Sequence, residues 1–231
     1  MREIVLDTET TGLNPLNGDR LVEIGCLELF NRVPTGEVFH VYLNPERDMP
    51  EEAFAVHGLS TAFLKDKPLF SSVVEDFVAF IGDAPLVIHN AAFDLSFLNA
   101  ELERISRPLI ARERLVDTLL LARRKHPAGP NGLDALCQRY RIDNSRRTKH
   151  GALLDAELLA EVYLELTGAR QTTLILAEAT TTTIQVGLVA AAPQVRPTPL
   201  APRLTEADRA AHRDFVATLG EGAIWQSFAA D

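Results

Sequence analysis

Two acidic side chains near the start of the chain have the spacing of a metal site. Asp7 and Glu9 follow the apolar run 4–6 and stand two residues apart. Alternate residues of a β-strand point to the same face, so two such carboxylates repel each other unless a cation lies between them. Mg²⁺ and Mn²⁺ prefer carboxylate oxygens, and a pair of such ions can activate water in phosphoryl transfer. The spacing therefore favours a divalent-metal site; the alternative is an ordinary polar strand end.

Two further carboxylates could complete such a site. Asp94 follows the apolar segment 86–88 and lies in the first turn of an expected helix, at the same carboxyl edge of a sheet as Asp7 and Glu9. Open sheets bind ligands at that edge. Asp155 lies on a later, longer expected helix.

His150 stands five residues before Asp155. Five residues turn a helix by about 500°, so the two side chains would not share a face of one continuous helix. We therefore expect His150 on the loop before the helix, where Gly151 would allow movement. An imidazole can accept a proton from a water near neutral pH, which makes His150 the candidate general base. The alternative is a surface or helix-capping histidine.

The elements that must position these side chains follow from the apolar patterning. Three early apolar segments predict an antiparallel meander, with the turn between the second and third at residues 34–36. Two later apolar segments, each followed by a helical pattern, predict parallel strands. The expected strands are 4–6, 20–30, 37–43, 86–88 and 115–116, and the expected helices are 71–81 with Ser71 as its cap, one that follows residue 90, 118–124, 133–140 and 153–166. We expect an α/β protein with a mixed five-stranded sheet and helices on both faces.

The composition is that of an ordinary globular protein. The 231 residues are 46% hydrophobic and 24% charged, which excludes collagen-like, coiled-coil and wholly disordered classes. No apolar stretch approaches the roughly 18 residues of a membrane span, so we expect a cytoplasmic protein without a membrane partner. Cys26 and Cys137 lack the spacing of a disulfide framework or a zinc site.

Charge is distributed unevenly along the chain. The net charge of −9 opposes binding to nucleic acid. Residues 101–150, however, carry 12 basic and 6 acidic side chains, and the basic run from Arg139 to Lys149 could contact phosphates. A basic surface beside an acidic centre suits a metal-dependent enzyme that acts on a phosphodiester. Solvated helix faces are the alternative explanation of such a run.

Three motifs carry a family resemblance. They are DTETTG from Asp7, HNAAFD from His89 and HGALLDA from His150. In this order they resemble the motifs of the DEDD superfamily of exonucleases, and most closely the epsilon, or proofreading, subunits of bacterial DNA polymerase III. The tyrosine branch of the superfamily would carry Tyr in place of Gly151, so the histidine branch is favoured. The resemblance covers residues 3–170 and includes the segments 50–58 and 133–137.

This resemblance implies a fold, a reaction and a set of site residues. The fold would be ribonuclease-H-like with a flexible C-terminal tail, and the reaction would be 3′-to-5′ removal of misincorporated nucleotides from a single-stranded 3′ end of DNA. Two divalent ions, Mg²⁺ or Mn²⁺, would be held by Asp7, Glu9, Asp94 and Asp155, while His150 deprotonates the attacking water. The implied substrate contacts are Asp7, Thr8, Glu9, Thr10, Gly12, Leu13, Glu52, His57, Asn90, Phe93 and Asp155.

The sequence after Gly168 implies partners. Its consecutive threonines and scattered prolines are typical of a linker. Within it, Gln171, Leu174 and Leu176 resemble the peptides by which bacterial replication proteins bind the beta sliding clamp. The last segment faintly resembles the epsilon tail that docks on the polymerase III alpha subunit; the alternative is a helix packed back on the domain. We expect an exonuclease domain at 1–170, a linker at 171–203 and a polymerase-docking segment at 204–231, in a nucleoid-associated protein.

Two other functions remain open. An RNA-directed 3′-to-5′ exonuclease of the oligoribonuclease or ribonuclease T type would use the same site, but those enzymes are usually compact single-domain dimers without a long tail. An adaptor between clamp and polymerase would not need four carboxylates and His150. The proofreading exonuclease accounts for both the motifs and the tail.

Overall fold

The computed structural model describes residues 1–168, residues 204–220 and Trp225. They belong to two compact units, the first containing residues 1–168 and the second the remaining described residues. The expected clamp contacts Gln171, Leu174 and Leu176 lie outside the described residues, as does the whole predicted linker. Within the described part of the chain, no helix has the length and apolar character needed to cross a membrane.

A mixed sheet forms the centre of the first unit. Its strands are β1 (Arg2–Thr10), β2 (Leu21–Phe30), β3 (Val33–Tyr42), β4 (Leu86–Ile88) and β5 (Leu115–Asp117). They lie in the order β3-β2-β1-β4-β5; β1 is antiparallel to β2 and parallel to β4, β2 is antiparallel to β3, and β4 is parallel to β5. The predicted mixed five-stranded sheet is confirmed, and β1 is its central strand.

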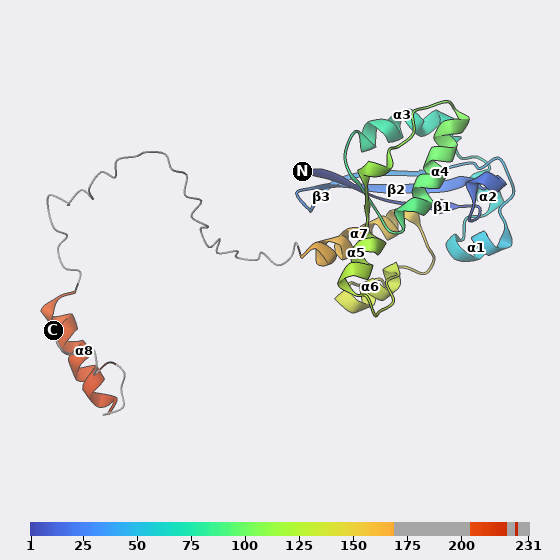
Figure 1. Cartoon of the computed structure of the whole chain (residues 1–231). Helices are drawn as coiled ribbons and strands as arrows, with labels where there is room; N and C mark the ends of the chain where they lie inside the picture. Colours follow the sequence, from blue (N-terminus) through green and yellow to red (C-terminus); the bar gives the residue numbers. More distant parts are fainter. Residues whose placement is uncertain (169–203, 221–224, 226–231) are drawn as a thin grey trace, which may run out of the picture. The chain divides into compact units, whose positions relative to one another are not determined.

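Helices cover both faces of the sheet. They are α3 (Phe70–Ile81) and α4 (Ala91–Arg104) on one face, and α5 (Thr118–Lys125), α6 (Leu133–Tyr140) and α7 (Ala152–Thr167) on the other. Figure 1 shows α3 on one side of the sheet and α7, α5 and α6 on the other. The side chains of β1 alternate between the two layers: Ile4 and Leu6 pack with α3 and α4, whereas Val5 packs with α7. The prediction of helices on both faces is also confirmed.

The hairpin between β2 and β3 differs from the prediction. Asn31 and Arg32 join the strands, with φ angles of 51° and 69°. Positive φ at both central residues is the conformation that a two-residue hairpin favours. The turn predicted at residues 34–36 is wrong, because these residues belong to β3, an edge strand where proline is tolerated. Ser71 is not the cap of α3 either, since this helix begins at Phe70.

Several short elements were not predicted. They are α1 (Glu51–His57), α2 (Thr61–Leu64) and the 3₁₀ turns Pro15–Asn17 and Arg112–Arg114. In the second unit, part of the predicted polymerase-docking segment forms α8 (Glu206–Thr218). Thr205 and Asp208 cap the start of α8 reciprocally, and the rings of His212 and Trp225 meet edge to face with centroids 6.0 Å apart.

Candidate active site

Successive side chains at the carboxyl end of β1 point to opposite faces of the sheet. Asp7 and Glu9 share the face of Val5, which packs against α7. Thr8 points to the opposite face, where its hydroxyl donates a hydrogen bond to Oδ1 of Asp94 on α4 at 2.7 Å. One short segment of β1 therefore presents polar side chains to both faces of the sheet, and one of them binds Asp94 of α4.

Asp94 reaches this segment because β1 and β4 are parallel. Their carboxyl ends meet at one edge of the sheet, and α4 begins there directly after β4. Asn90 makes the connection in the left-handed conformation, with φ of 65°. Asp94 is the fourth residue of α4 and is buried, as its predicted place in the first helical turn requires.

A glycine on β2 lets α7 approach from the other face. Gly25 lies opposite Asp7 in the sheet, and a Cβ at this position would stand 2.3 Å from backbone atoms of Ala152 and Leu153. Only a residue without a side chain allows this approach of the first turn of α7. Asp155, at the end of this first turn of α7, is thereby brought to the face of β1 that carries Asp7.

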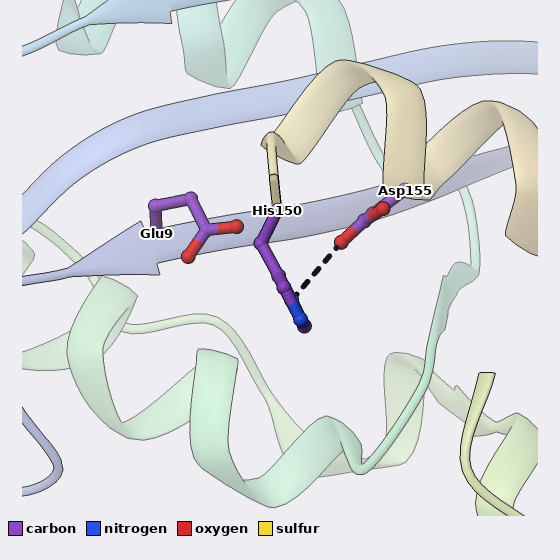
Figure 2. A group of neighbouring side chains, drawn as sticks. All are labelled: Glu9, His150 and Asp155. Atoms are coloured by element: carbon purple, nitrogen blue, oxygen red, sulfur yellow. Dashed lines mark ion pairs between the residues drawn. The ribbon is translucent and has the colours of Figure 1, made fainter. Parts of the chain in front are cut away.

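In the described part of the chain, Glu9, His150 and Asp155 form a group whose ligand atoms lie close enough together to hold a metal ion (Figure 2). One ligand atom of each lies within 4.8 Å of the others, and Nδ1 of His150 is 3.5 Å from Oδ2 of Asp155. Helix α7 begins at Ala152, so His150 stands on the preceding loop as predicted. Its side chain is 47% exposed, whereas that of Asp155 is buried, and solvent can therefore reach the imidazole.

A cavity of about 690 Å³ surrounds this group. The predicted site residues that line it are Asp7, Thr8, Glu9, Leu13, Asn90, Phe93, Asp94, His150 and Asp155. Thr10, Gly12, Glu52 and His57 are not among its lining residues. The Thr10 hydroxyl donates instead to the carbonyl of Gly12 at 2.6 Å, and Glu52 is exposed on α1.

His57 is buried at the end of α1. Its Nδ1 accepts a hydrogen bond from the backbone N–H of Leu59 at 3.1 Å, while Nε2 has no hydrogen-bond partner among the described residues. Burial lowers its pKa below the ordinary histidine value. The preceding carbonyl, that of Val56, accepts a hydrogen bond from the backbone N–H of His150 at 3.3 Å. The C-terminal turn of α1 therefore supports the loop that carries His150.

The clustered carboxylates hold their protons more tightly than isolated ones. The pKa of Asp7 is raised well above its ordinary value by burial and by the charges of Asp94 and Glu9. Burial, followed by the charge of Asp155, raises the pKa of Glu9 to about 8. Burial raises the pKa of Asp94 to about 7, although the hydrogen bond from Thr8 opposes the change. A cation among these oxygens would relieve the repulsion, and the oxygen donors fit Mg²⁺ or Mn²⁺.

Three polar side chains that sequence reasoning did not place in the site also line the cavity. His89 stands within the second motif and contacts Thr118 Oγ1 at 2.9 Å. Asp134 belongs to the segment 133–137 that shares the family resemblance. Arg147 belongs to the basic run that was expected to face phosphates, yet its guanidinium contacts Asp155. Motif membership could have indicated the first two, whereas the contact of Arg147 depends on tertiary structure.

Comparisons with known proteins agree with this arrangement. The family model described as an exonuclease, RNase_T, matches residues 4–163. Over 174 residues the chain is 56% identical to DNA polymerase III subunit epsilon of Rickettsia felis, covering 74% of this chain and 76% of that protein. The corresponding subunit of Escherichia coli is 51% identical over 176 residues, covering 73% of this chain and 72% of that protein.

A solved structure shares the fold at low sequence identity. The nuclease domain of 3′hExo, a DEDDh family member bound to rAMP, aligns with a TM-score of 0.62 and 14% identity, covering 73% of this chain and 92% of that one. The ribonuclease-H-like exonuclease fold is thereby confirmed. The chain belongs to the exonuclease family and, within it, to the DNA polymerase III epsilon subunits, the proofreading 3′-to-5′ exonucleases.

Proposed function

We propose that this chain hydrolyses the terminal phosphodiester at a single-stranded 3′ end of DNA with Asp7, Glu9, Asp94 and Asp155 as ligands of two divalent ions. The observation that carries the proposal is the convergence of Glu9, His150 and Asp155 in one cavity. Two such ions, Mg²⁺ or Mn²⁺, lower the pKa of water and stabilise charge on the departing oxygen.

His150 is the proposed general base. It is the one imidazole of the tight ligand group, and its half-exposed side chain can release a proton to solvent. The backbone N–H of His150 donates a hydrogen bond to the carbonyl of Val56 in α1. This contact helps to hold the loop of the proposed base in place. The proposed ligand carboxylates are held in place, because β1, α4 and α7, which carry them, are parts of the packed core.

The substrate contacts are proposed from the lining of the cavity. Phe93 offers a half-buried ring and Leu13 an exposed apolar side chain, and both suit contact with unpaired bases. Asn90 adds a polar contact at the start of α4. Thr8 also lines the cavity. The family resemblance adds Thr10 and Gly12 at the terminal nucleotide and Glu52 and His57 near its sugar, although these four residues do not line the cavity.

The partners are proposed from the relatives and the tail. As a subunit of the replicative polymerase, the chain would act in the cytoplasm at the nucleoid, docked on the alpha subunit through residues 204–231. Gln171, Leu174 and Leu176 would bind the beta sliding clamp. Tethering of this kind raises the local concentration of the enzyme without a new contact to DNA.

The test is a time course of the full chain with Mn²⁺ on DNA with an unpaired 3′ end and on RNA of the same sequence. We expect mononucleotides to leave the DNA faster. Asp7→Asn and His150→Gln should each lower the rate by about 100-fold or more, whereas Asp66→Asn, at an exposed position after α2, should not. Faster cleavage of RNA would favour the RNA-directed exonuclease, and no cleavage with intact polymerase binding would favour the adaptor.

A further inference from the structure

One cation is buried among the acidic side chains of the cavity. The side chain of Arg147 is 7% exposed. Its Nε donates to Oδ1 of Asp155 at 2.5 Å and its Nη2 to Oδ2 at 2.7 Å. Nη2 also lies 2.9 Å from Nδ1 of His150, and Nη1 donates to the carboxylate of Asp134 at 2.7 Å. The guanidinium therefore joins α6, α7 and the loop between them.

These contacts engage Asp155 and His150, the proposed metal ligand and the proposed general base. Each oxygen of Asp155 accepts a hydrogen bond from Arg147, so a metal ion bound by Asp155 would share these oxygens with a second positive charge. A guanidinium has only donors, so the same contact engages the lone pair of His150 Nδ1. A guanidinium and a divalent ion at the same carboxylate repel each other, so ion binding at Asp155 favours departure of Nε and Nη2 from its oxygens.

Asp134 provides a second place for the guanidinium. It lies in the first turn of α6, with its side chain 61% exposed, and already accepts a hydrogen bond from Arg147. Because this bond uses Nη1 alone, it can persist when Nε and Nη2 leave Asp155. The displaced charge would then remain paired at the rim of the cavity.

The loop is anchored independently of this contact. The ammonium of Lys149 donates to the carbonyl of Ala55, and the backbone N–H of His150 donates to the carbonyl of Val56. Both partners belong to α1, whereas the partners of Arg147 described above belong to α6, α7 and the loop itself. The loop therefore keeps its connection to α1 when Arg147 moves.

We infer that Arg147 is an internal, displaceable cation and a positioning residue of the exonuclease: it holds Asp155 and His150 until a divalent ion takes Asp155, and then stays attached through Asp134. The inference rests on the proposed function, since it takes Asp155 as a metal ligand. It predicts that Arg147 opposes metal binding, whereas Asp134 assists binding only while Arg147 is present.

The test measures Mn²⁺ dissociation constants of the full chain by calorimetry without DNA. Arg147→Met should bind Mn²⁺ about tenfold more tightly, because hydrogen bonds to a charged group no longer have to be broken. Arg146→Met removes the same charge from the same loop, at a side chain that pairs with Glu157 instead, and should change the constant little. Asp134→Asn should weaken binding about two- to fivefold.

The double variant Arg147→Met/Asp134→Asn separates displacement from simple charge effects. If Arg147 is displaced onto Asp134, the double variant binds Mn²⁺ like Arg147→Met alone. If both residues act only through their net charge, Asp134→Asn weakens binding equally in both backgrounds, and the inference fails. Should Arg147→Met not fold, Arg147→Lys, which lacks the planar fork, and Asp134→Asn decide: unchanged constants in both overturn the inference.

Asp155→Asn distinguishes this inference from the proposed function. Loss of Mn²⁺ binding in Asp155→Asn together with unchanged binding in Arg147→Met would overturn the role of Arg147 and leave the metal site standing. Binding by Asp155→Asn equal to that of the wild type would overturn the metal site itself, and the inference with it.

Discussion

Glu9→Gln replaces a buried titratable carboxyl by a neutral amide of nearly the same size and shape. Glu9 is 8% exposed and pairs with Glu23 across β1 and β2. Burial, then the charges of Asp155 and Glu23, raise the pKa of Glu9 from 4.5 to about 8. Between these values the folded protein holds a proton that the unfolded chain has released, so the free energy of unfolding decreases as the pH rises.

The size of the effect follows from the two pKa values. At pH 7, about 2.5 units above the ordinary pKa of 4.5, the unfolded chain has lost this proton and the folded protein still holds it. At about 1.4 kcal/mol per unit, the raised pKa lowers the free energy of unfolding at pH 7 by about 3 kcal/mol. Without divalent ions, Glu9→Gln should therefore be more stable than the wild type by up to about 3 kcal/mol at pH 7 and nearly equal to it near pH 4.5. Glu37→Gln, at an exposed position of β3, should show no such difference.

The assay is urea unfolding of the full chain in EDTA, followed by far-UV circular dichroism from pH 4.5 to 8. The single tryptophan, Trp225, lies in the second unit, so its fluorescence would not follow β1. Adding Mn²⁺ at pH 8 should reverse the order, because an ion that binds the folded wild type stabilises it. A stability difference that is independent of pH would refute the reasoning, since it would not come from a proton at Glu9.

Three other results are expected. Mn²⁺ binding at pH 7 should displace about one proton or more from the clustered carboxyls, whose pKa values are raised, and fewer at pH 9; calorimetry in buffers of different ionisation enthalpy counts these protons. Gly25→Ala should cost about 1–3 kcal/mol in urea unfolding and lower the nuclease rate, because its methyl group meets the backbone of α7, whereas Gly132→Ala, with open space around it, should not cost this stability. Gln171→Ala with Leu174→Ala should weaken capture by the clamp in a pull-down and leave hydrolysis of a short single strand unchanged.

The convergence of the acidic residues was predictable because it depends on regular geometry. The period of two places Asp7 and Glu9 on one face, and parallel pairing of β1 with β4 brings Asp94 to the same edge. The turn angle of a helix predicts that His150 precedes the helix that carries Asp155, and α7 indeed begins at Ala152. These rules need only the order and type of the elements, which the apolar pattern supplies.

Other features depend on contacts that no local pattern contains. The turn at Asn31 and Arg32 was missed because proline and glycine nearby are commoner turn residues, and only the pairing of β2 with β3 shows the register. Arg147 carries the same sequence signal as the other arginines of its run. Its burial between α6 and α7 follows from how these helices pack, which is a property of the assembled core.

The position of β1 between two cores has a consequence for the order in which the molecule opens. A strand that packs against helices on both faces and hydrogen-bonds on both edges exchanges its amide hydrogens only when the whole domain unfolds. The loop of His150, by contrast, is held by a few side-chain and backbone contacts and can open at a small fraction of that free energy. Low concentrations of denaturant should thus inactivate the enzyme while the amides of β1 remain protected from hydrogen exchange. Inactivation and unfolding are therefore separate events.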